Sequence, residues 1–544
     1  MKVHEAVARA VRDCGVQTLF GVQGEANLHV IDHLVHRHDV RYLKAAREDG
    51  AVLMADGFAR LTGSVGVATV TKGPGLTNTV TALTTAVRAR TPLVLLTGTT
   101  RADDPWALQR IDQQAVVAPT GAGYVRLTSS ESVGDQVAMT FRRAGLESRP
   151  MVLDLPLDVQ GQDVQVQDVH DLVSGILAEP AAHSELDAGD LDRAMGIMAS
   201  ARRPIIVAGQ GAVRSSAQSQ ILALAQRLGA PVASTLMAKD IFRGAPFDLG
   251  VFGTLSTTFA QRVIGEADCV IAVGASLNPK TTSNGTMVAG RSVVHIDTVP
   301  QRIGECTPVD GTLIGDARHV CATIVELLDK AGHEPSGFAS PALAAELAAY
   351  RVLDDVVDHS TRATVDSRVV SVLLDEILPS ERTLVNDAGR FMRDAITGLH
   401  APGPGSFLST ISFASMGMGM ATAVGAAVAR PDRPTVLVIG DGGLMMSMQE
   451  LSTAVRYGLD LIVLVYNNGA YGAEVSSARD HGLSVDESIF DWAAFAPIAA
   501  AYGAVGLTVE NLDDLDFVGT AVKHRDRPIL VDLKLDPMAP SGFA

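Results

Sequence analysis

Two polar segments in the last third of the chain each follow an apolar run. Asp441 comes just after the run 435–439, and Asn468 comes just after the run 461–465, 27 positions later. That spacing fits one strand–helix–strand unit, in which the carboxyl ends of the two strands meet at the same edge of a parallel sheet. We therefore expect a carboxylate and an amide oxygen to lie side by side. Such hard oxygen ligands suit Mg²⁺ when phosphate oxygens and water complete its shell.

Glycines surround the aspartate at positions Gly440, Gly442 and Gly443. Glycine lets a backbone approach a ligand closely, and the stretch 444–457 has the pattern of a helix whose first N–H groups would face the same place. Taken alone, each piece also fits an ordinary strand-end aspartate or a turn-forming asparagine pair. Together, at this spacing, they indicate a site for a cation and a phosphate.

Five apolar runs, each introduced by a proline, predict the strands that position these groups. The prolines are Pro92, Pro150, Pro204, Pro434 and Pro528. Runs rich in Val, Ile and Leu without alternation are typical of strands buried on both faces, and a proline suits the point where a strand begins. Amphipathic stretches such as 218–228 and 451–457 lie between the runs. The pattern predicts an α/β fold of doubly wound parallel sheets.

Two changes of composition predict linkers, over residues 161–190 and 335–367. The chain then divides into three segments, 1–165, 190–335 and 365–535. Their patterns look alike, although the sequence repetition between them is weak.

The composition excludes several classes of protein. Of 544 residues, 47% are hydrophobic and 19% are charged, so the chain can fold around sizeable cores. The net charge of −17 argues against a nucleic-acid partner, because phosphate neutralisation needs a basic surface. The uncharged stretch 401–429 is broken by Pro and Gly, which argues against a membrane span. Four scattered cysteines suggest free thiols, and we expect a cytoplasmic protein.

Four segments together resemble a known family. The Asp441 and Asn468 segments match the thiamine diphosphate signature. Residues 47–60 resemble the catalytic-glutamate segment of acetolactate synthase-like enzymes, 72–78 resembles their Gly-Pro-Gly loop, and 415–419 resembles the segment that supports the cofactor's aminopyrimidine. The resemblance implies three doubly wound domains: pyrimidine-binding (1–165), central nucleotide-fold (190–335) and diphosphate- and Mg²⁺-binding (365–535).

The resemblance also implies which residues hold the cofactor. The metal ligands would be Asp441, Asn468 and the main-chain oxygen of Ala470. Further cofactor contacts would come from Ala414, Met416, Gly389, Arg390, Gly440, Gly442, Gly443, Gly73 and Asn78. Arg390 is unusual in its loop, and pairing with phosphate and pointing to solvent are equally open.

Glu48 is the expected catalytic acid–base group. In the resembling enzymes a carboxyl at this position exchanges a proton with the pyrimidine ring nitrogen, and burial favours the protonated form that such a group needs. The alternative is a helix N-terminal glutamate that complements the helix dipole. Met416 would hold the bent cofactor from below, with the N–H of Met416 and the carbonyl of Ala414 at the pyrimidine edge.

On the substrate side, Glu25 could relay protons or could cap a helix over 26–34. Gln109 matches a glutamine near the active site of the synthase branch. The paired histidines of pyruvate decarboxylases are missing, which weakens a simple decarboxylase interpretation. The segment 274–280 lacks the arginines that would meet FAD, which argues against FAD binding, and Trp492 looks like a core residue.

The resemblance implies a thiamine diphosphate- and Mg²⁺-dependent enzyme that decarboxylates a 2-oxo acid and transfers the enamine to an acceptor carbonyl. A non-oxidative 2-oxo acid decarboxylase or a 2-hydroxy ketone lyase is the alternative, and a non-catalytic cofactor-binding subunit is a third. In relatives Glu48 and the metal site meet across two chains, so a homodimer or homotetramer is expected.

Overall fold

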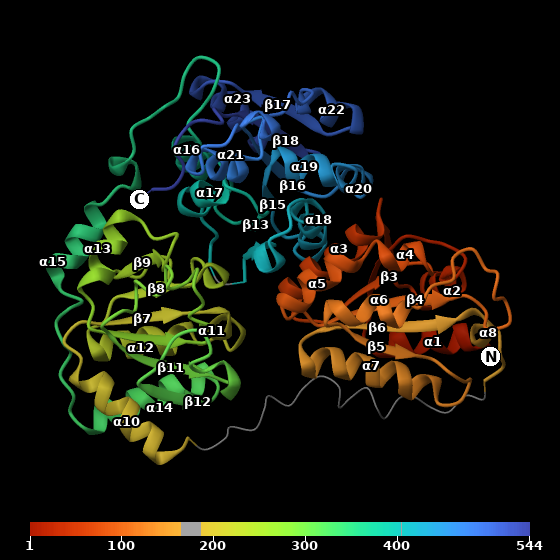
Figure 1. The fold of residues 1–544 in the computed structure, drawn as a ribbon, viewed down its shortest axis with the longest axis horizontal. Helices are drawn as coiled ribbons and strands as arrows, with labels where there is room; N and C mark the ends of the chain where they lie inside the picture. The colour runs from red at the N-terminus through yellow and green to blue at the C-terminus, as the bar shows by residue number, and fades with distance from the viewer. Residues whose placement is uncertain (165–185, 404, 544) are drawn as a thin grey trace. The chain divides into compact units, whose positions relative to one another are not determined.

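The computed structural model describes residues 1–164, 186–403 and 405–543. Three six-stranded sheets follow one another along the chain, and helices flank each of them (Figure 1). The predicted α/β fold with three parallel sheets is confirmed. Among the described residues, no helix is long and apolar enough to cross a membrane.

The first sheet has the strand order β2-β1-β3-β4-β6-β5, and its strands pair in parallel. Its strands are β1 Thr18–Gly21, β2 Arg41–Lys44, β3 Gly66–Thr69, β4 Leu93–Thr99, β5 Gly123–Arg126 and β6 Pro150–Pro156. Its helices are α1 Val3–Asp13, α2 Leu28–His38, α3 Glu48–Thr62, α4 Pro74–Thr77, α5 Val80–Arg88, α6 Gln113–Val117, α7 Val133–Glu147 and α8 Leu157–Gln160.

The third sheet has the order β14-β13-β15-β16-β18-β17. Its strands are β13 Thr383–Asn386, β14 Phe407–Ser409, β15 Thr435–Gly440, β16 Leu461–Asn467, β17 Val505–Val509 and β18 Ile529–Lys534. The helices of this part of the chain are α16 Ser367–Ile377, α17 Met392–Gly398, α18 Gly419–Ala429, α19 Asp441–Ser447, α20 Glu450–Arg456, α21 Gly472–Asp480, α22 Phe495–Tyr502 and α23 Leu515–Lys523.

The second sheet has a different order, β12-β11-β10-β7-β8-β9. Numbered within the sheet and read from β9, this is 3-2-1-4-5-6, the order of dinucleotide-binding folds. Its strands are β7 Pro204–Ala208, β8 Val232–Ser234, β9 Asp248–Val251, β10 Cys269–Val273, β11 Ser292–Asp297 and β12 Gly311–Ile314. Its helices are α10 Ala188–Ser200, α11 Gln210–Arg214, α12 Gln218–Leu228, α13 Thr258–Glu266, α14 Ala317–Lys330 and α15 Pro341–Ala349.

All five proline-introduced runs form strands, namely β4, β6, β7, β15 and β18. Nearly every residue in them is buried, as expected for strands covered on both faces. The proline costs no ladder hydrogen bond here because it stands at the start of the strand or just before it.

The first sheet forms one compact unit with residues 383–390 and 408–537, which carry the third sheet. Within this unit α3 and α18 pack closely on each other. Two glycines allow the approach: a Cβ at Gly57 would collide with the carbonyl oxygen of Thr422, and one at Gly425 with the carbonyl oxygen of Met54. The helices that follow two equivalent edge strands are therefore in backbone contact.

Two helices differ from the sequence expectations. The stretch 444–457, expected as one helix, forms α19 and α20, and α19 already begins at Asp441. The helix expected over 26–34 is α2, which begins at Leu28. Most of the linker expected over 161–190 lies outside the described residues, and the domain limits 1–165, 190–335 and 365–535 stay a prediction.

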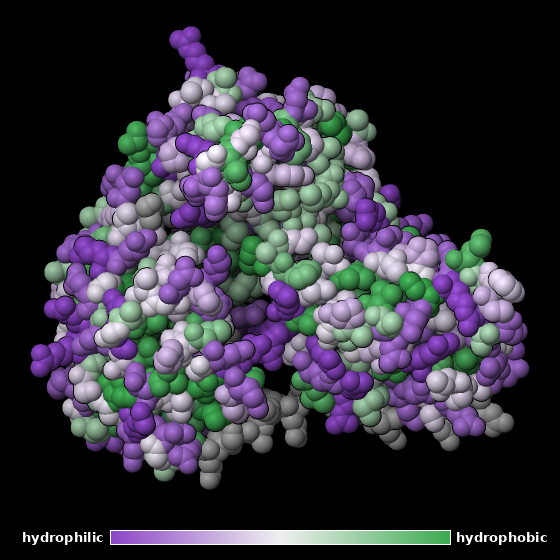
Figure 2. Space-filling view, viewed as in Figure 1, coloured by the Kyte–Doolittle hydropathy of each residue, from purple (hydrophilic) through white to green (hydrophobic). Residues whose placement is uncertain are grey.

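Figure 2 shows hydrophilic side chains over much of the visible face, with apolar groups scattered among them. The most exposed large apolar side chains are Trp106 and Leu108, in the loop after β4. All four cysteines are free thiols.

Candidate cofactor and active site

Asp441 and Asn468 meet at the tips of two neighbouring strands. β15 and β16 pair in parallel, with Gly440 opposite Tyr466. Asp441 follows β15 directly and Asn468 follows β16 directly. Oδ2 of Asp441 and Oδ1 of Asn468 accept the same N–H, that of Ala470, at 3.2 and 3.1 Å. The spacing in the sequence thus brings the two side-chain oxygens together, as the strand–helix–strand interpretation expects.

The Asp441 carboxylate is held in place by neutral donors. The N–H of Gly442 donates to Oδ1 at 2.9 Å, and the indole Nε1 of Trp492 donates to Oδ2 at 3.0 Å. Burial raises the pKa of Asp441 to about 6, although these N–H groups oppose the rise. A buried carboxylate beside an amide oxygen, without a charged donor among these contacts, fits a divalent cation as its missing counter-charge.

Trp492 has a role that the sequence did not indicate. It packs partly against the hydrophobic core, as expected, but its indole N–H donates to the Asp441 carboxylate. Its ring stacks on Phe490 at 4.6 Å between centroids, and Phe490 meets Tyr471 edge-on at 4.5 Å. The aromatic trio Tyr471–Phe490–Trp492 therefore lines one side of the Asp441 site.

The glycines around Asp441 are required by close neighbours. A Cβ at Gly442 would lie 2.7 Å from the ring of Tyr471, and one at Gly443 would lie 2.6 Å from Oδ2 of Asp387. Any side chain at these positions would push the tyrosine ring or the aspartate aside. The two glycines therefore let the backbone beside Asp441 pack closely against Tyr471 and Asp387.

Asp387 supports the Met416 loop. It follows β13 and is fully buried, and it accepts the N–H of Gly417 at 2.8 Å, the N–H of Gly419 at 3.1 Å and the hydroxyl of Thr410 at 2.9 Å. Burial raises its pKa to about 6. Asp387, in the loop that also carries Gly389 and Arg390, thus holds the loop of Met416 in place.

The Met416 loop has a special backbone. Ala414 is exposed and takes a left-handed conformation with φ 57°, and Gly417 has φ 79° with a potential Cβ only 2.8 Å from the Cβ of Met446. Met416 stands half-buried between them. The glycine is needed at position 417 both for the positive φ and for the space.

Glu48 begins α3, and a buried acid from the third sheet's segment positions it. Glu450 in α20 accepts the N–H of Ala46 at 3.0 Å and the N–H of Arg47 at 3.1 Å. Burial raises the pKa of Glu450. A Cβ at Gly50 would collide with the same carboxylate. Glu450 thus fixes the backbone on both sides of Glu48.

Glu48 itself is half-buried, and its Oε2 accepts the amide of Asn78 at 3.0 Å. A cavity of about 530 Å³ lies beside this pair, lined by Asn78, Arg47, Asp49, Gly50, Leu53 and Thr81, by 415–418 and Ala421, and by Met445, Met446, Ser447, Gln449 and Glu450. Met416 and Asn78 therefore share one cavity. Neither Glu48 nor the Asp441–Asn468 pair is among its lining residues.

The Gly73 loop depends on Gln113, which the sequence did not single out. Gly73 has φ 61°, and its N–H donates to Oε1 of Gln113 at 2.9 Å. The buried Gln113 amide donates in turn to the carbonyl oxygen of Gly98 and to Thr99, each at 2.9 Å. Gln109, the expected glutamine, is exposed, and its backbone carbonyl packs against Gly73. Both glutamines follow β4, so only the fold separates their roles.

Glu25 does not cap α2. The N-cap position is Asn27, whose Oδ1 accepts the N–H of Gly24 at 2.8 Å. The largely exposed Glu25 carboxylate instead pairs with Lys72, whose side chain is buried. The capping alternative for Glu25 is wrong because the helix starts further along the chain.

Arg390 lies near the Asn468 tip. Its Nη1 donates to the carbonyl oxygen of Pro537 at 3.3 Å, and its Cδ lies 3.3 Å from where a Cβ at Gly472 would stand. The half-buried side chain therefore packs against the start of α21. Gly389 beside it is half-buried too.

Comparison with known proteins agrees with the geometry. Three family models match: the N-terminal binding domain of thiamine pyrophosphate enzymes over residues 1–116, their central domain over 191–324 and their C-terminal binding domain over 387–533. The chain belongs to the thiamine pyrophosphate enzyme family and is acetolactate synthase-like within it.

Relatives cover nearly the whole chain. A probable acetolactate synthase large subunit of Methanococcus aeolicus is 29% identical over 99% of this chain and 93% of its own length. An acetolactate synthase large subunit of Haemophilus influenzae is 27% identical over 98% and 94%. A sulfoacetaldehyde acetyltransferase of Castellaniella defragrans is 29% identical over 96% and 90%. Relatives of similar identity thus carry names for different reactions.

Proposed function

We propose that the protein is a Mg²⁺- and thiamine diphosphate-dependent carboligase, which decarboxylates a 2-oxo acid and joins the remaining fragment to an acceptor carbonyl. The observation that carries the proposal is the convergence of the Asp441 and Asn468 oxygens on the N–H of Ala470. The names of the relatives, acetolactate synthase and sulfoacetaldehyde acetyltransferase, support transfer to an acceptor.

Asp441, Asn468 and the carbonyl oxygen of Ala470 would hold Mg²⁺, and the backbone at Gly440, Gly442 and Gly443 would take the diphosphate, with Gly389 and Arg390 beside it. When bound, thiamine diphosphate supplies an acidic carbon that attacks carbonyl groups and accepts the electron pair released with CO₂. Trp492 and the N–H of Gly442 hold the Asp441 carboxylate in place and would keep it available to the ion.

The pyrimidine end needs a proton-handling group and a support. Glu48 would hold a proton at the ring nitrogen, and Asn78 would orient its carboxylate. Met416 would support the bent cofactor, while the carbonyl of Ala414 and the N–H of Met416 bond the ring edge. Glu450 and Asp387 set the backbone of these two segments from behind.

Substrate recognition would fall to the loops of the first sheet. Glu25, paired with Lys72, and Gln109, packed on Gly73, are the candidates to contact the substrate or to move its protons. A decarboxylase, a 2-hydroxy ketone lyase and a non-catalytic subunit remain outcomes of the assay rather than the favoured function.

The assay measures CO₂ release from pyruvate and formation of a carbon–carbon bond, with and without an aldehyde or 2-oxo acid acceptor. Product that contains both fragments supports the carboligase. CO₂ release that leaves only free aldehyde identifies a decarboxylase. Cleavage of a 2-hydroxy ketone without 2-oxo acid turnover identifies a lyase. Cofactor binding without turnover of any of these compounds supports the non-catalytic subunit and overturns the proposal.

We further propose that the working form is at least a homodimer in which Glu48 of one chain serves the metal site of the other. This arrangement is the one that the resemblance to acetolactate synthase-like enzymes implies, in which the glutamate and the metal site meet across two chains. Mixing the inactive variants Glu48→Gln and Asp441→Ala tests it. Random re-pairing would restore about a quarter of wild-type activity, because half of the dimers are mixed and each mixed dimer has one intact site. No recovery, despite subunit exchange shown by mass, would place both groups in one chain.

A further inference from the structure

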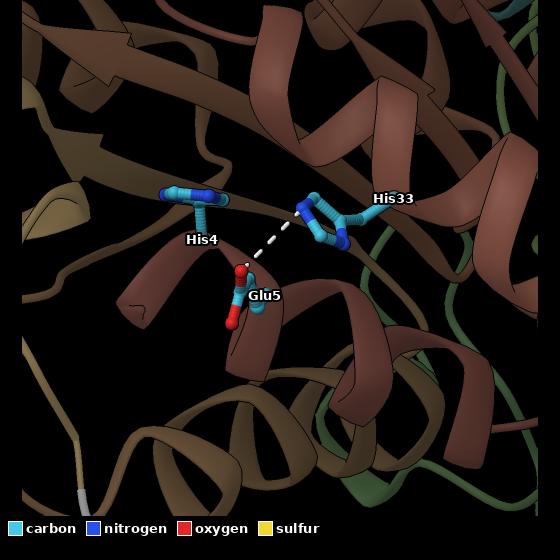
Figure 3. A group of neighbouring side chains, drawn as sticks. All are labelled: His4, Glu5 and His33. Carbon is cyan, nitrogen blue, oxygen red and sulfur yellow. Dashed lines mark ion pairs between the residues drawn. The ribbon is translucent and has the colours of Figure 1, made fainter. Parts of the chain in front are cut away.

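A cluster of histidines and one glutamate lies between α1 and α2. His4 and Glu5 stand in the first turn of α1, and His33 stands on α2, which packs against α1. One ligand atom from each of the three lies within 4.8 Å of the others. Figure 3 shows the three side chains gathered between the two helices. None of them takes part in the proposed reaction.

Backbone contacts orient two of the three side chains. Nδ1 of His4 lies 2.9 Å from the carbonyl oxygen of Gln160, which can only accept, so Nδ1 carries the proton and Nε2 of the neutral ring keeps its lone pair. Oε2 of Glu5 accepts the N–H of Lys2 at 2.9 Å. Its other oxygen, Oε1, lies 3.8 Å from Nε2 of His33. Hydrogen-bond partners that orient the side chain in this way are typical of metal-binding histidines and carboxylates.

A further imidazole stands close by, outside the group of three. His29 lies one helical turn before His33 on α2, and its ring centroid is 4.9 Å from that of His4. Histidines at positions i and i+4 face the same side of a helix. Imidazole nitrogens with one carboxylate suit zinc and its transition-metal neighbours, whereas Mg²⁺ prefers oxygen ligands alone.

We propose that His4, Glu5 and His33 form a binding site for a zinc-class divalent transition ion, with His29 as the nearest candidate for a fourth ligand. The site would bridge α1 and α2 and is separate from the proposed Mg²⁺ site in its ligands and in its sheet. An ion there would stabilise the first sheet's segment, because it binds only when the two helices are packed together. The inference does not depend on the proposed function.

The α2 helix offers a matched control. His36 faces Asp32 one turn earlier, with Nε2 3.8 Å from Oδ1, the same separation as in the His33–Glu5 pair. That second pair is exposed. Among the described residues, no third metal-ligating side chain lies close enough to complete a cluster with it. It therefore reproduces one histidine–carboxylate contact without the cluster.

Equilibrium titration of the intact protein with Zn²⁺, and with Co²⁺ as a spectroscopic probe, tests the site. Excess Mg²⁺ is present to saturate oxygen-ligand sites, and a Cys306→Ser background removes the exposed thiol. We expect one ion per chain, visible absorption of Co²⁺ typical of nitrogen and oxygen ligands, and a rise in melting temperature. His33→Gln and His4→Gln should each weaken Zn²⁺ binding by more than about tenfold, whereas His36→Gln should leave it unchanged.

Two results would overturn the site. One is equal Zn²⁺ affinity in wild type, His33→Gln and His4→Gln, each shown to be folded by circular dichroism. The other is a loss in His36→Gln as large as in His33→Gln, which would mark unspecific binding along α2. Because His33 is only part-buried, its glutamine variant keeps the test informative even if His4→Gln misfolds.

Discussion

The first and third sheets share one strand order but carry different chemistry at their strand tips. With the strands of each sheet numbered along the chain, both sheets have the order 2-1-3-4-6-5. After the third strand, the first sheet has Lys72 and Gly73, whereas the third sheet has Asp441 and its glycines. The fold supplies equivalent positions, and the residues placed there decide what binds.

The two regions also differ in which partner supports them. The helices after the two edge strands, α3 and α18, pack on each other, and each begins beside an expected cofactor residue, Glu48 or Met416. The Met416 loop is held by Asp387 of its own sheet, whereas the Glu48 segment is held by Glu450 from the other. The backbone beside Glu48 is therefore held from the third sheet's segment, whereas the Met416 loop is held from within its own segment.

The largest effect should come from removing the ion ligand. Asp441→Ala should lose Mg²⁺ and thiamine diphosphate binding together and lower activity by more than about 100-fold. Mutating residues that only hydrogen-bond to a metal ligand already lowers metal affinity or activity by about 10–100-fold. Asp432→Ala, exposed at the opposite end of the same strand, should keep both. Calorimetric titration and the steady-state rate measure the two effects. Normal cofactor affinity in Asp441→Ala would show that the third sheet's strand tip does not differ from the first in holding the cofactor.

Glu48→Gln should separate catalysis from binding. We expect cofactor affinity within a few-fold of wild type and a rate about 10²–10⁴-fold lower, the usual contribution of a positioned acid–base group. Proton exchange at the reactive cofactor carbon, followed by NMR, should fall in parallel. The exposed Glu131→Gln is the control. Wild-type exchange in Glu48→Gln would return Glu48 to a helix-dipole role.

Trp492→Phe should keep the stacking on Phe490 but lose the N–H bond to Asp441, and it should weaken Mg²⁺ binding about 10-fold. Trp106→Phe is a close control, because Trp106 is 89% exposed and is the other of the two tryptophans. In Trp106→Phe, fluorescence reports Trp492 alone and should respond to cofactor binding. A silent signal there, with binding shown by calorimetry, would place the cofactor elsewhere.

Glu450→Gln tests the support of the first region by the third. The amide keeps the size of the side chain and one acceptor oxygen, so we expect a rate about 10-fold lower with cofactor affinity unchanged. Exposed Glu510→Gln is the control. A loss of cofactor affinity without a change in rate would show that Glu450 acts on the third sheet rather than on Glu48.

The smallest effect is a pH dependence of stability without cofactor. Burial raises the pKa of Asp387 and of Asp441 from an ordinary 3.8 to about 6. Such groups favour folding when protonated, so the free energy of unfolding should fall as pH rises from about 4 through 6, by at most about 3 kcal/mol for each. Urea unfolding across this range measures it. Mg²⁺ with diphosphate should restore stability above pH 6 through Asp441 and not through Asp387.

Local sequence signals predicted much of the fold. Proline followed by a buried apolar run marked five strands, and the spacing of Asp441 and Asn468 predicted their approach because one strand–helix–strand unit fixes it. The shared strand order of the first and third sheets was not predicted, since non-local pairing leaves no local pattern in the sequence.

The supporting residues could not be predicted either. Glu450 meets Ala46 across 404 positions, and Trp492 meets Asp441 across 51 positions. Gln113 rather than Gln109 holds Gly73 because the loop after β4 turns its later residue inward. Only three-dimensional packing selects one polar residue among similar neighbours. Asp441 could be predicted because the strand and the glycines that mark it are its neighbours in the sequence. Its indole donor, Trp492, could not be predicted, because it lies 51 positions away.

Calorimetric titration of thiamine diphosphate into the metal-free wild-type protein, with and without Mg²⁺, tests most directly whether the Asp441–Asn468 tip holds the cofactor through an ion. We predict saturable binding close to one cofactor per chain that requires Mg²⁺ and disappears with a chelator. Binding of equal affinity without any divalent ion, or no binding in either condition, would contradict the assignment.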